Sequence, residues 1–110
     1  SFVKAKGRFF GVEFSDGEIC IKVLDSVEAI RQEGEAMHHC VFTNEYYLKA
    51  DSLILSATID GKRIETIEVS LKRMEVVKSR GVCNKNKPYP GQILKLMKGN
   101  MSLIRQRMTA

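Results

Sequence analysis

Three adjacent side chains, His38, His39 and Cys40, form the densest group in the chain that could carry out catalysis. A thiol next to an imidazole can act as an activated nucleophile, and the histidines could bind a metal ion together with Cys40 and Cys83. Neither arrangement has a standard motif spacing, because the chain contains no CxxC or HxxxH pair. In the structural alternative, His38 packs in the core on the apolar stripe of a helix, or acts as a cation at the helix end. We therefore assign no metal ligands and predict no particular cofactor.

Glu68 is a second candidate for acid–base chemistry. The Asp60-Gly61 pair predicts a two-residue hairpin turn, and regular pairing across it places Glu68 on the apolar face of its strand. A carboxylate there must be paired or protonated, so Glu68 could be a general base, a metal ligand or the group that orients His38. A structural ion pair with His38 or Arg80 is the alternative. The same pairing turns Glu65 to the opposite, solvated face.

A third group follows the last predicted strand. Arg80 could bind an anion as a planar fork, next to Gly81, which permits a close backbone approach. Asn84 tolerates tight turns, so an ordinary turn with a surface arginine explains the same residues. The candidate catalytic residues of a hydrolase or transferase are therefore His38, Glu68, Arg80 and Asn84.

Basic residues gather toward the end of the chain, which carries 18 Lys+Arg against 13 Asp+Glu and a formal charge of +5. Such a stretch could follow a phosphate backbone, and the order of elements over residues 26–107 is similar to that of double-stranded-RNA-binding domains. The alternative is a solvated helix face. The candidate nucleic-acid-binding residues are Arg80, Lys85, Lys87, Lys95 and Lys98.

The elements that must position these residues follow from hydrophobic periodicity and turn signals. Residues 8–24 alternate around a short turn at 15–17, which predicts a hairpin. Helical spacing over residues 26–39, with Asp25 and Glu28 as a capping box, predicts a helix. Further strands are expected at 52–59, 62–71 and 74–80, followed by an amphipathic helix at 91–108. This ββαβββα order predicts an α+β domain: an antiparallel sheet with both helices packed on one face.

Length and composition agree with one ordinary globular domain. The chain has 110 residues, of which 44% are hydrophobic and 28% charged, so intrinsic disorder is not expected. It lacks the roughly 18–20 consecutive apolar residues of a membrane span. Three widely spaced cysteines indicate reduced thiols in the cytoplasm rather than a disulfide framework. Because the chain does not begin with Met, we expect that it can be a fragment of a longer protein.

Several segments carry a family resemblance. They are SVEAIRQEGEAMHHCV (26–41), RIETIEVSL (63–71) and SRGVCN (79–84), with Tyr46-Tyr47, ILSA (54–57) and the helix after Ile93. Over about residues 8–107 the chain resembles the PcfJ-like family of plasmid and conjugative-element proteins. The resemblance implies a bacterial cytoplasmic protein of mobile elements, with a role in nucleic-acid transactions, and it implies no assigned chemistry. Lys78 and Pro90 stand where relatives commonly have Gln and His, so a family site would be altered here.

These observations lead to two expectations of different class. The first is a non-catalytic module that binds nucleic acid or a protein partner through the basic loop and the last helix. The second is a hydrolase or transferase built on the four candidate catalytic residues. A structural subunit of a larger assembly is a third reading.

Overall fold

The computed structural model describes residues 1–38, 48–81 and 89–109. Five antiparallel strands form one sheet in the order β1-β2-β3-β4-β5. The strands are β1 (Glu13–Ser15), β2 (Ile19–Val23), β3 (Ser52–Ile59), β4 (Lys62–Ser70) and β5 (Glu75–Gly81). The described helices are α1 (Phe2–Lys6), the 3-10 turn η1 (Gly7–Phe9), α2 (Val27–Met37) and α4 (Tyr89–Met108). The predicted α+β class and the ββαβββα order of the main elements are confirmed.

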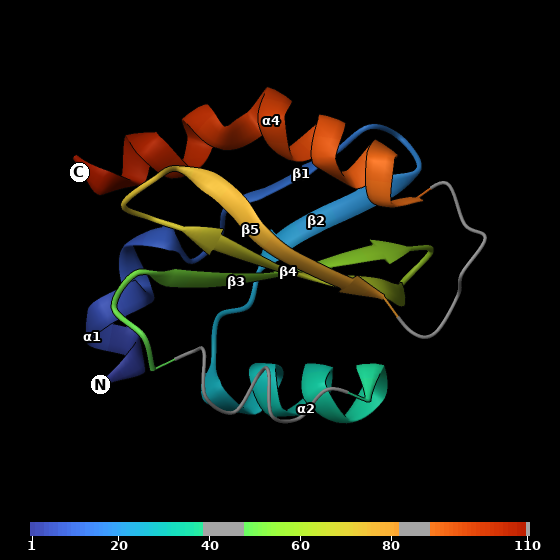
Figure 1. Cartoon of the computed structure of the whole chain (residues 1–110). Coiled ribbons are helices and arrows are strands. Elements are labelled where there is room, and N and C mark those ends of the chain that lie inside the picture. Colours follow the sequence, from blue (N-terminus) through green and yellow to red (C-terminus); the bar gives the residue numbers. More distant parts are fainter. Residues whose placement is uncertain (39–47, 82–88, 110) are drawn as a thin grey trace.

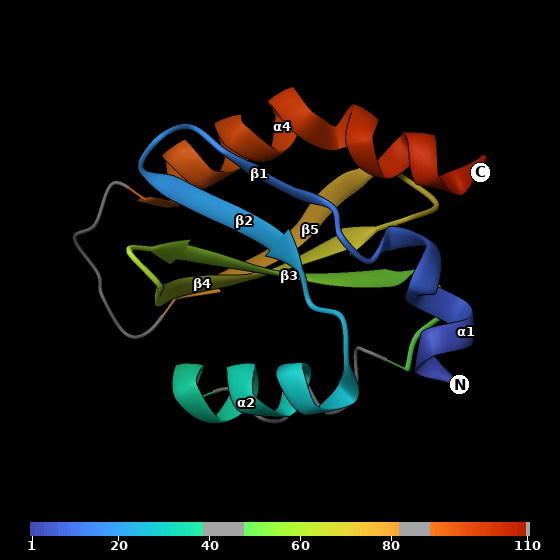
Figure 2. The same cartoon turned by 180° about the vertical axis from the view of Figure 1, so that it is seen from behind.

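The two long helices cover opposite faces of the sheet, with α4 on one side and α2 on the other (Figures 1 and 2). Leu53 and Leu55 pack in the main core with the buried side of α4, whereas Ile54 packs with Ile30 of α2. The prediction that both helices share one face is therefore wrong. The physical reason is that β3 is buried at every position from Ser52 to Ala57. A strand buried on both faces needs a covering layer on each side.

The predicted hairpin turns are confirmed. Asp16 closes the β1–β2 turn, since its Oδ1 atom accepts hydrogen bonds from the backbone N–H groups of Glu18 and Ile19 at 2.9 and 2.8 Å. In the β3–β4 turn, Asp60 and Gly61 have φ angles of 50° and 79°, as a two-residue hairpin with this sequence requires.

The register that we expected between β3 and β4 is wrong beyond the turn. A β-bulge at Ile64 makes Thr58 pair with Arg63 but Ala57 with Glu65. One inserted residue moves every following side chain to the other face. Glu68 therefore lies opposite Ile54, on the α2 side of the sheet, and not among the residues that face α4. Glu65 takes the α4 side and is buried rather than solvated.

Both ends of α2 differ from the prediction. The N-cap is Ser26, whose hydroxyl accepts the backbone N–H of Ala29 at 2.9 Å, and not Asp25. The helix ends at Met37, and His38 is its C-cap in the left-handed conformation, with φ 59°. The hairpin predicted at residues 8–24 begins later, because β1 starts at Glu13 and residues 8 and 9 belong to η1. None of the described helices combines the length and apolar character that crossing a bilayer requires.

Candidate functional site: a polar layer between α2 and the sheet

The side of the sheet that α2 covers is unusually polar. Cross-strand partners lie on the same face of a sheet. On β3 and β4, most of the side chains on the face away from α4 carry a hydroxyl or carboxyl group. The buried polar residues on this side are Ser52, Ser56, Thr66, Glu68 and Ser70. Buried polar atoms are costly unless they are hydrogen-bonded, and within the described residues every buried side-chain nitrogen and oxygen has a partner. The layer is therefore fully hydrogen-bonded.

Glu33 of α2 lies at the centre of this polar layer with none of its surface exposed. Its Oε1 atom accepts hydrogen bonds from Ser56 Oγ and Arg63 Nε, both at 2.8 Å, and its Oε2 atom accepts one from Thr66 Oγ1. Arg63 is also its ion-pair partner, with 36% of the arginine side chain exposed. The three contacts join α2 to β3 and β4 through polar groups where packed apolar side chains are the usual solution.

Sequence reasoning missed Glu33, although a signal was present. Glu33 follows Ile30 by three residues and precedes Met37 by four, so it lies on the inward side of the helix with both. An acidic residue at that spacing indicates a buried carboxylate. Its partners were not evident, because Arg63 reaches Glu33 from the strand position next to the bulge.

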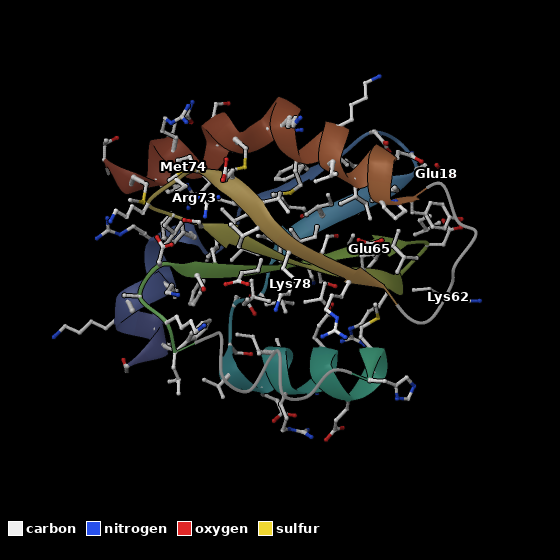
Figure 3. The ribbon with its side chains drawn as sticks, in the orientation of Figure 1. Glu18, Lys62, Glu65, Arg73, Met74 and Lys78 are labelled. Atoms are coloured by element: carbon white, nitrogen blue, oxygen red, sulfur yellow. The ribbon has the colours of Figure 1, made fainter. Side chains whose placement is uncertain are left out.

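Glu68 is the second buried carboxylate. It accepts a hydrogen bond from Ser52 Oγ, and its cross-strand partner on β5 is Lys78 (Figure 3). Lys6 of α1 is also buried, and its Nζ atom donates to the carbonyl oxygens of Lys49, at 2.8 Å, and Ser52. Burial lowers the pKa of Lys6, whereas the negative charges of Asp51 and Glu68 raise it. Glu68 thus belongs to a charged cluster that joins α1 to the sheet.

The predicted catalytic residues are only partly brought together. Arg80 lies on the α2 side of the sheet, opposite Thr66, and is exposed. His38 is exposed at the end of α2 rather than packed in the core, so its predicted place on the apolar stripe is wrong. The left-handed cap turns the chain away from the helix at that residue, and this ends the stripe. Asn84 lies outside the described residues, as do His39, Cys40, Cys83, Lys85 and Lys87.

His38 and Glu68 are also separated along the polar layer. Glu33 contacts Thr66, and α2 continues from there toward the Asp60-Gly61 turn, whereas β4 runs from Thr66 to Glu68 in the opposite direction (Figures 1 and 2). His38 lies five helical residues beyond Glu33, and Glu68 lies two strand residues beyond Thr66 in the opposite direction. The two are therefore roughly 14 Å apart along the polar layer. Neither His38 nor Arg80 forms a hydrogen bond or ion pair with Glu68 in the described part of the chain.

Lys78 and Pro90, the two positions where we expected a departure from the family pattern, have structural explanations here. Lys78 lies opposite Glu68 on β5 and adds a positive charge to that side of the sheet. Pro90 is in the first turn of α4, where its missing N–H group would have no helical partner in any case.

A cleft of about 310 Å³ opens beside Glu33, between α2 and strands β1–β4. Cys20 and Arg63 are among its lining residues, together with Lys22, Thr58 and Glu13. The Cys20 thiol donates to Glu13 Oε1 at 3.3 Å. Partial burial and the neighbouring Glu13 carboxylate raise the pKa of Cys20, which disfavours the nucleophilic thiolate. Among the described residues no group of three or more His, Cys, Asp or Glu side chains is placed to hold a metal ion.

The exposed side of α4 carries part of the basic stretch that the sequence analysis identified. Ile93, Met97, Met101 and Ile104 are buried, and at 100° per residue Lys95, Lys98 and Arg105 fall within an arc of about 80° that runs from the flank of the helix to its outer side. We call these three residues the cationic stripe. All three are exposed, and α4 contains no acidic residue. Arg107 is not part of this stripe, because its guanidinium donates hydrogen bonds to the backbone carbonyls of Arg8 and Phe10, both at 3.0 Å. These bonds attach the C-terminal end of α4 to the segment around η1.

Comparison with known proteins identifies the family. No solved structure and no curated protein matches the chain significantly. A family model described as PcfJ-like protein matches residues 1–94, which include all five strands and α2. On this match the chain belongs to the family of PcfJ-like proteins.

Proposed function

We propose that this domain is a nucleic-acid interaction module that binds the phosphate backbone with the outer side of α4. The observation that carries the proposal is the cationic stripe on a helix with no acidic residue. Within the described residues, Lys95, Lys98 and Arg105 form no ion pair, so their charge is available to a partner. The stripe extends over about 15 Å of helix, and phosphates along one strand of a duplex advance about 3.4 Å per nucleotide.

The other candidate nucleic-acid-binding residues fit this proposal to different degrees. Lys85 and Lys87 belong to the segment that joins β5 to α4 and precede the stripe in sequence. Arg80 lies at the end of β5 but on the α2 side of the sheet, so it would contact a nucleic acid only at the sheet edge. The mobile-element context and the cytoplasmic location implied by the family resemblance remain predictions.

A hydrolase or transferase is the second candidate function. One observation favours it: two carboxylates, Glu33 and Glu68, are buried on the sheet face that α2 covers, and a binding module has little need of them. The four-residue site that we predicted loses support, because His38 is exposed and distant from Glu68. Glu68 moreover has a structural explanation in its contact with Ser52 and the charge of Lys6.

Fluorescence anisotropy with labelled single- and double-stranded DNA and RNA tests the first proposal. We expect affinity to fall steeply with salt, since each phosphate contact contributes about 0.9 to the slope of log K against log salt concentration on duplex DNA. The variant Lys95→Gln/Lys98→Gln/Arg105→Gln should bind more weakly and reduce that slope by about 2–3. A second variant, changing Arg80, Lys85 and Lys87 to Glu, tests the remaining candidates.

The matched control removes the same number of charges elsewhere. Lys4, Lys62 and Lys72 are exposed and lie away from α4 in sequence, and Lys62 projects from the hairpin end of the sheet (Figure 3). Changing these three to Gln lowers the net charge equally and should leave most of the binding intact. The proposal fails if both triple variants weaken binding equally, or if the protein binds none of the four probes at low salt.

A further inference from the structure

The strongest unassigned feature outside α4 is the way in which Arg63 is held. Its Nε atom donates to Glu33 Oε1 at 2.8 Å, and Glu33 is completely buried and fixed by two further hydroxyl groups. A guanidinium group has five N–H donors, and within the described residues this contact with Glu33 is the hydrogen bond that Arg63 makes. The terminal amino groups therefore stay available, on a side chain that is 36% exposed and lines the cleft. A buried carboxylate that positions an arginine in this way reduces the entropy that the arginine loses on binding a ligand.

Two more donors lie beside Arg63 on the same side of the sheet. Thr58 is its cross-strand partner and lines the cleft, and its hydroxyl has no hydrogen-bond partner among the described residues. Lys22 lies one strand further, opposite Ser56, and is exposed in the same cleft. An arginine fork, a hydroxyl group and an ammonium group around one space are the donors that recognise an oxyanion.

The rest of the cleft limits the kind of molecule that carries this oxyanion. Glu13 and Asp25 also line it and are exposed, and Glu13 is the cross-strand partner of Lys22. These two carboxylates repel an extended polyanion such as a nucleic acid. The volume of about 310 Å³ is at the lower end of the range for small-molecule sites. A compact ligand with one anionic group and hydrogen-bond donors elsewhere fits these charges.

We propose that the cleft between α2 and β1–β4 binds a small molecule through a phosphate or carboxylate group, which Arg63, Thr58 and Lys22 hold. In this site Glu33 is a positioning residue, because it contacts Arg63 and is too deeply buried to contact the ligand. The site is independent of the cationic stripe, since α2 and α4 cover opposite faces of the sheet (Figures 1 and 2). It also accounts for the part of the buried polar layer around Glu33, which a nucleic-acid interaction module does not need.

The test is a titration of the full chain, labelled with ¹⁵N, with inorganic phosphate and in parallel with acetate. We expect saturable shifts of the backbone amide signals of Thr58, Gly61 and Arg63 at millimolar concentrations. The probe that saturates at the lower concentration identifies the anionic group. Because a lysine cannot form the planar fork, Arg63→Lys should weaken binding about tenfold or more. Thr58→Val should weaken it several-fold by removing one hydroxyl donor.

Two controls separate this site from general effects. Arg31→Lys makes the same substitution on the outer side of α2, where Arg31 pairs with Glu28 and Glu35, and it should not change the affinity. The triple variant of the cationic stripe should also bind phosphate or acetate normally, even if it loses nucleic-acid binding. If Arg63→Lys does not fold, Thr58→Val and Lys22→Gln at accessible positions provide the test. The proposal is overturned if neither anion gives saturable shifts up to about 20 mM, or if the shifts occur only in α4.

Discussion

Replacing Glu33 should reveal what the polar layer contributes to stability. In Glu33→Ala the hydroxyls of Ser56 and Thr66 lose their acceptor while they remain buried, which costs about 1–3 kcal/mol for each group. The loss of the ion pair with Arg63 adds less, since the partly exposed arginine can be solvated by water. We therefore expect the free energy of unfolding to fall by about 3–5 kcal/mol, measured by urea denaturation with circular dichroism.

The compensating variant makes this prediction sharper. In Glu33→Met/Ser56→Ala/Thr66→Val, the buried acid and both hydroxyl donors become apolar together, so no buried group is left without a partner. Replacing a buried polar network by apolar groups of similar size is often neutral or stabilising, so the triple variant should recover most of the loss. Glu35→Ala, on the outer side of α2 where Glu35 is 61% exposed, should change stability little.

Two results would refute the reasoning about this layer. A loss below about 1 kcal/mol in Glu33→Ala would mean that water replaces the carboxylate at no cost. A triple variant as unstable as the single variant would mean that the polar groups are needed for folding itself. If instead the triple variant folds stably but no longer binds phosphate or acetate, the layer serves the binding site and not the fold.

Three further predictions follow from other contacts. Gly81→Ala should destabilise the domain by about 1–2 kcal/mol in thermal unfolding, because the new Cβ atom would lie 3.0 Å from the carbonyl oxygen of Ile64. Burial lowers the pKa of Lys6 in the folded state below its usual value of 10.5. At pH values between the lowered pKa and 10.5 the unfolded chain binds more protons than the folded one, so the free energy of unfolding rises with pH. Lys6→Met should lack this rise in denaturation curves measured at alkaline pH. Cys20 should react slowly with iodoacetamide at neutral pH, and Glu13→Gln should speed the reaction, measured by peptide mass spectrometry, because Glu13 helps to raise the pKa of the thiol.

Local signals in the sequence predicted most of the secondary structure. The Asp60-Gly61 pair predicts its hairpin because both residues adopt positive φ angles there. The periodicity of α2 and α4 predicts amphipathic helices because a helix must bury one side. These signals act over a few residues, and the structure confirms each of them.

Local sequence signals did not predict on which face of the sheet Glu68 and Glu65 lie. Regular pairing across the turn predicted their faces, and the bulge at Ile64 exchanged them. A bulge changes the ladder by one residue and depends on how the whole sheet twists and packs. Both carboxylates are nevertheless buried, since helices cover both sides of the central strands.

The sequence by itself determined the α+β class, the family, the order of the main elements and the cationic, acid-free character of the last helix. Only the tertiary structure decided that α2 and α4 lie on opposite faces, that Glu33 binds Arg63, and that His38 stays apart from Glu68. The reason is physical: periodicity shows which side of a helix is apolar, but not which surface of the sheet it covers. That choice, together with the register set at Ile64, brings Glu33, Ser56, Arg63 and Thr66 together from distant parts of the chain.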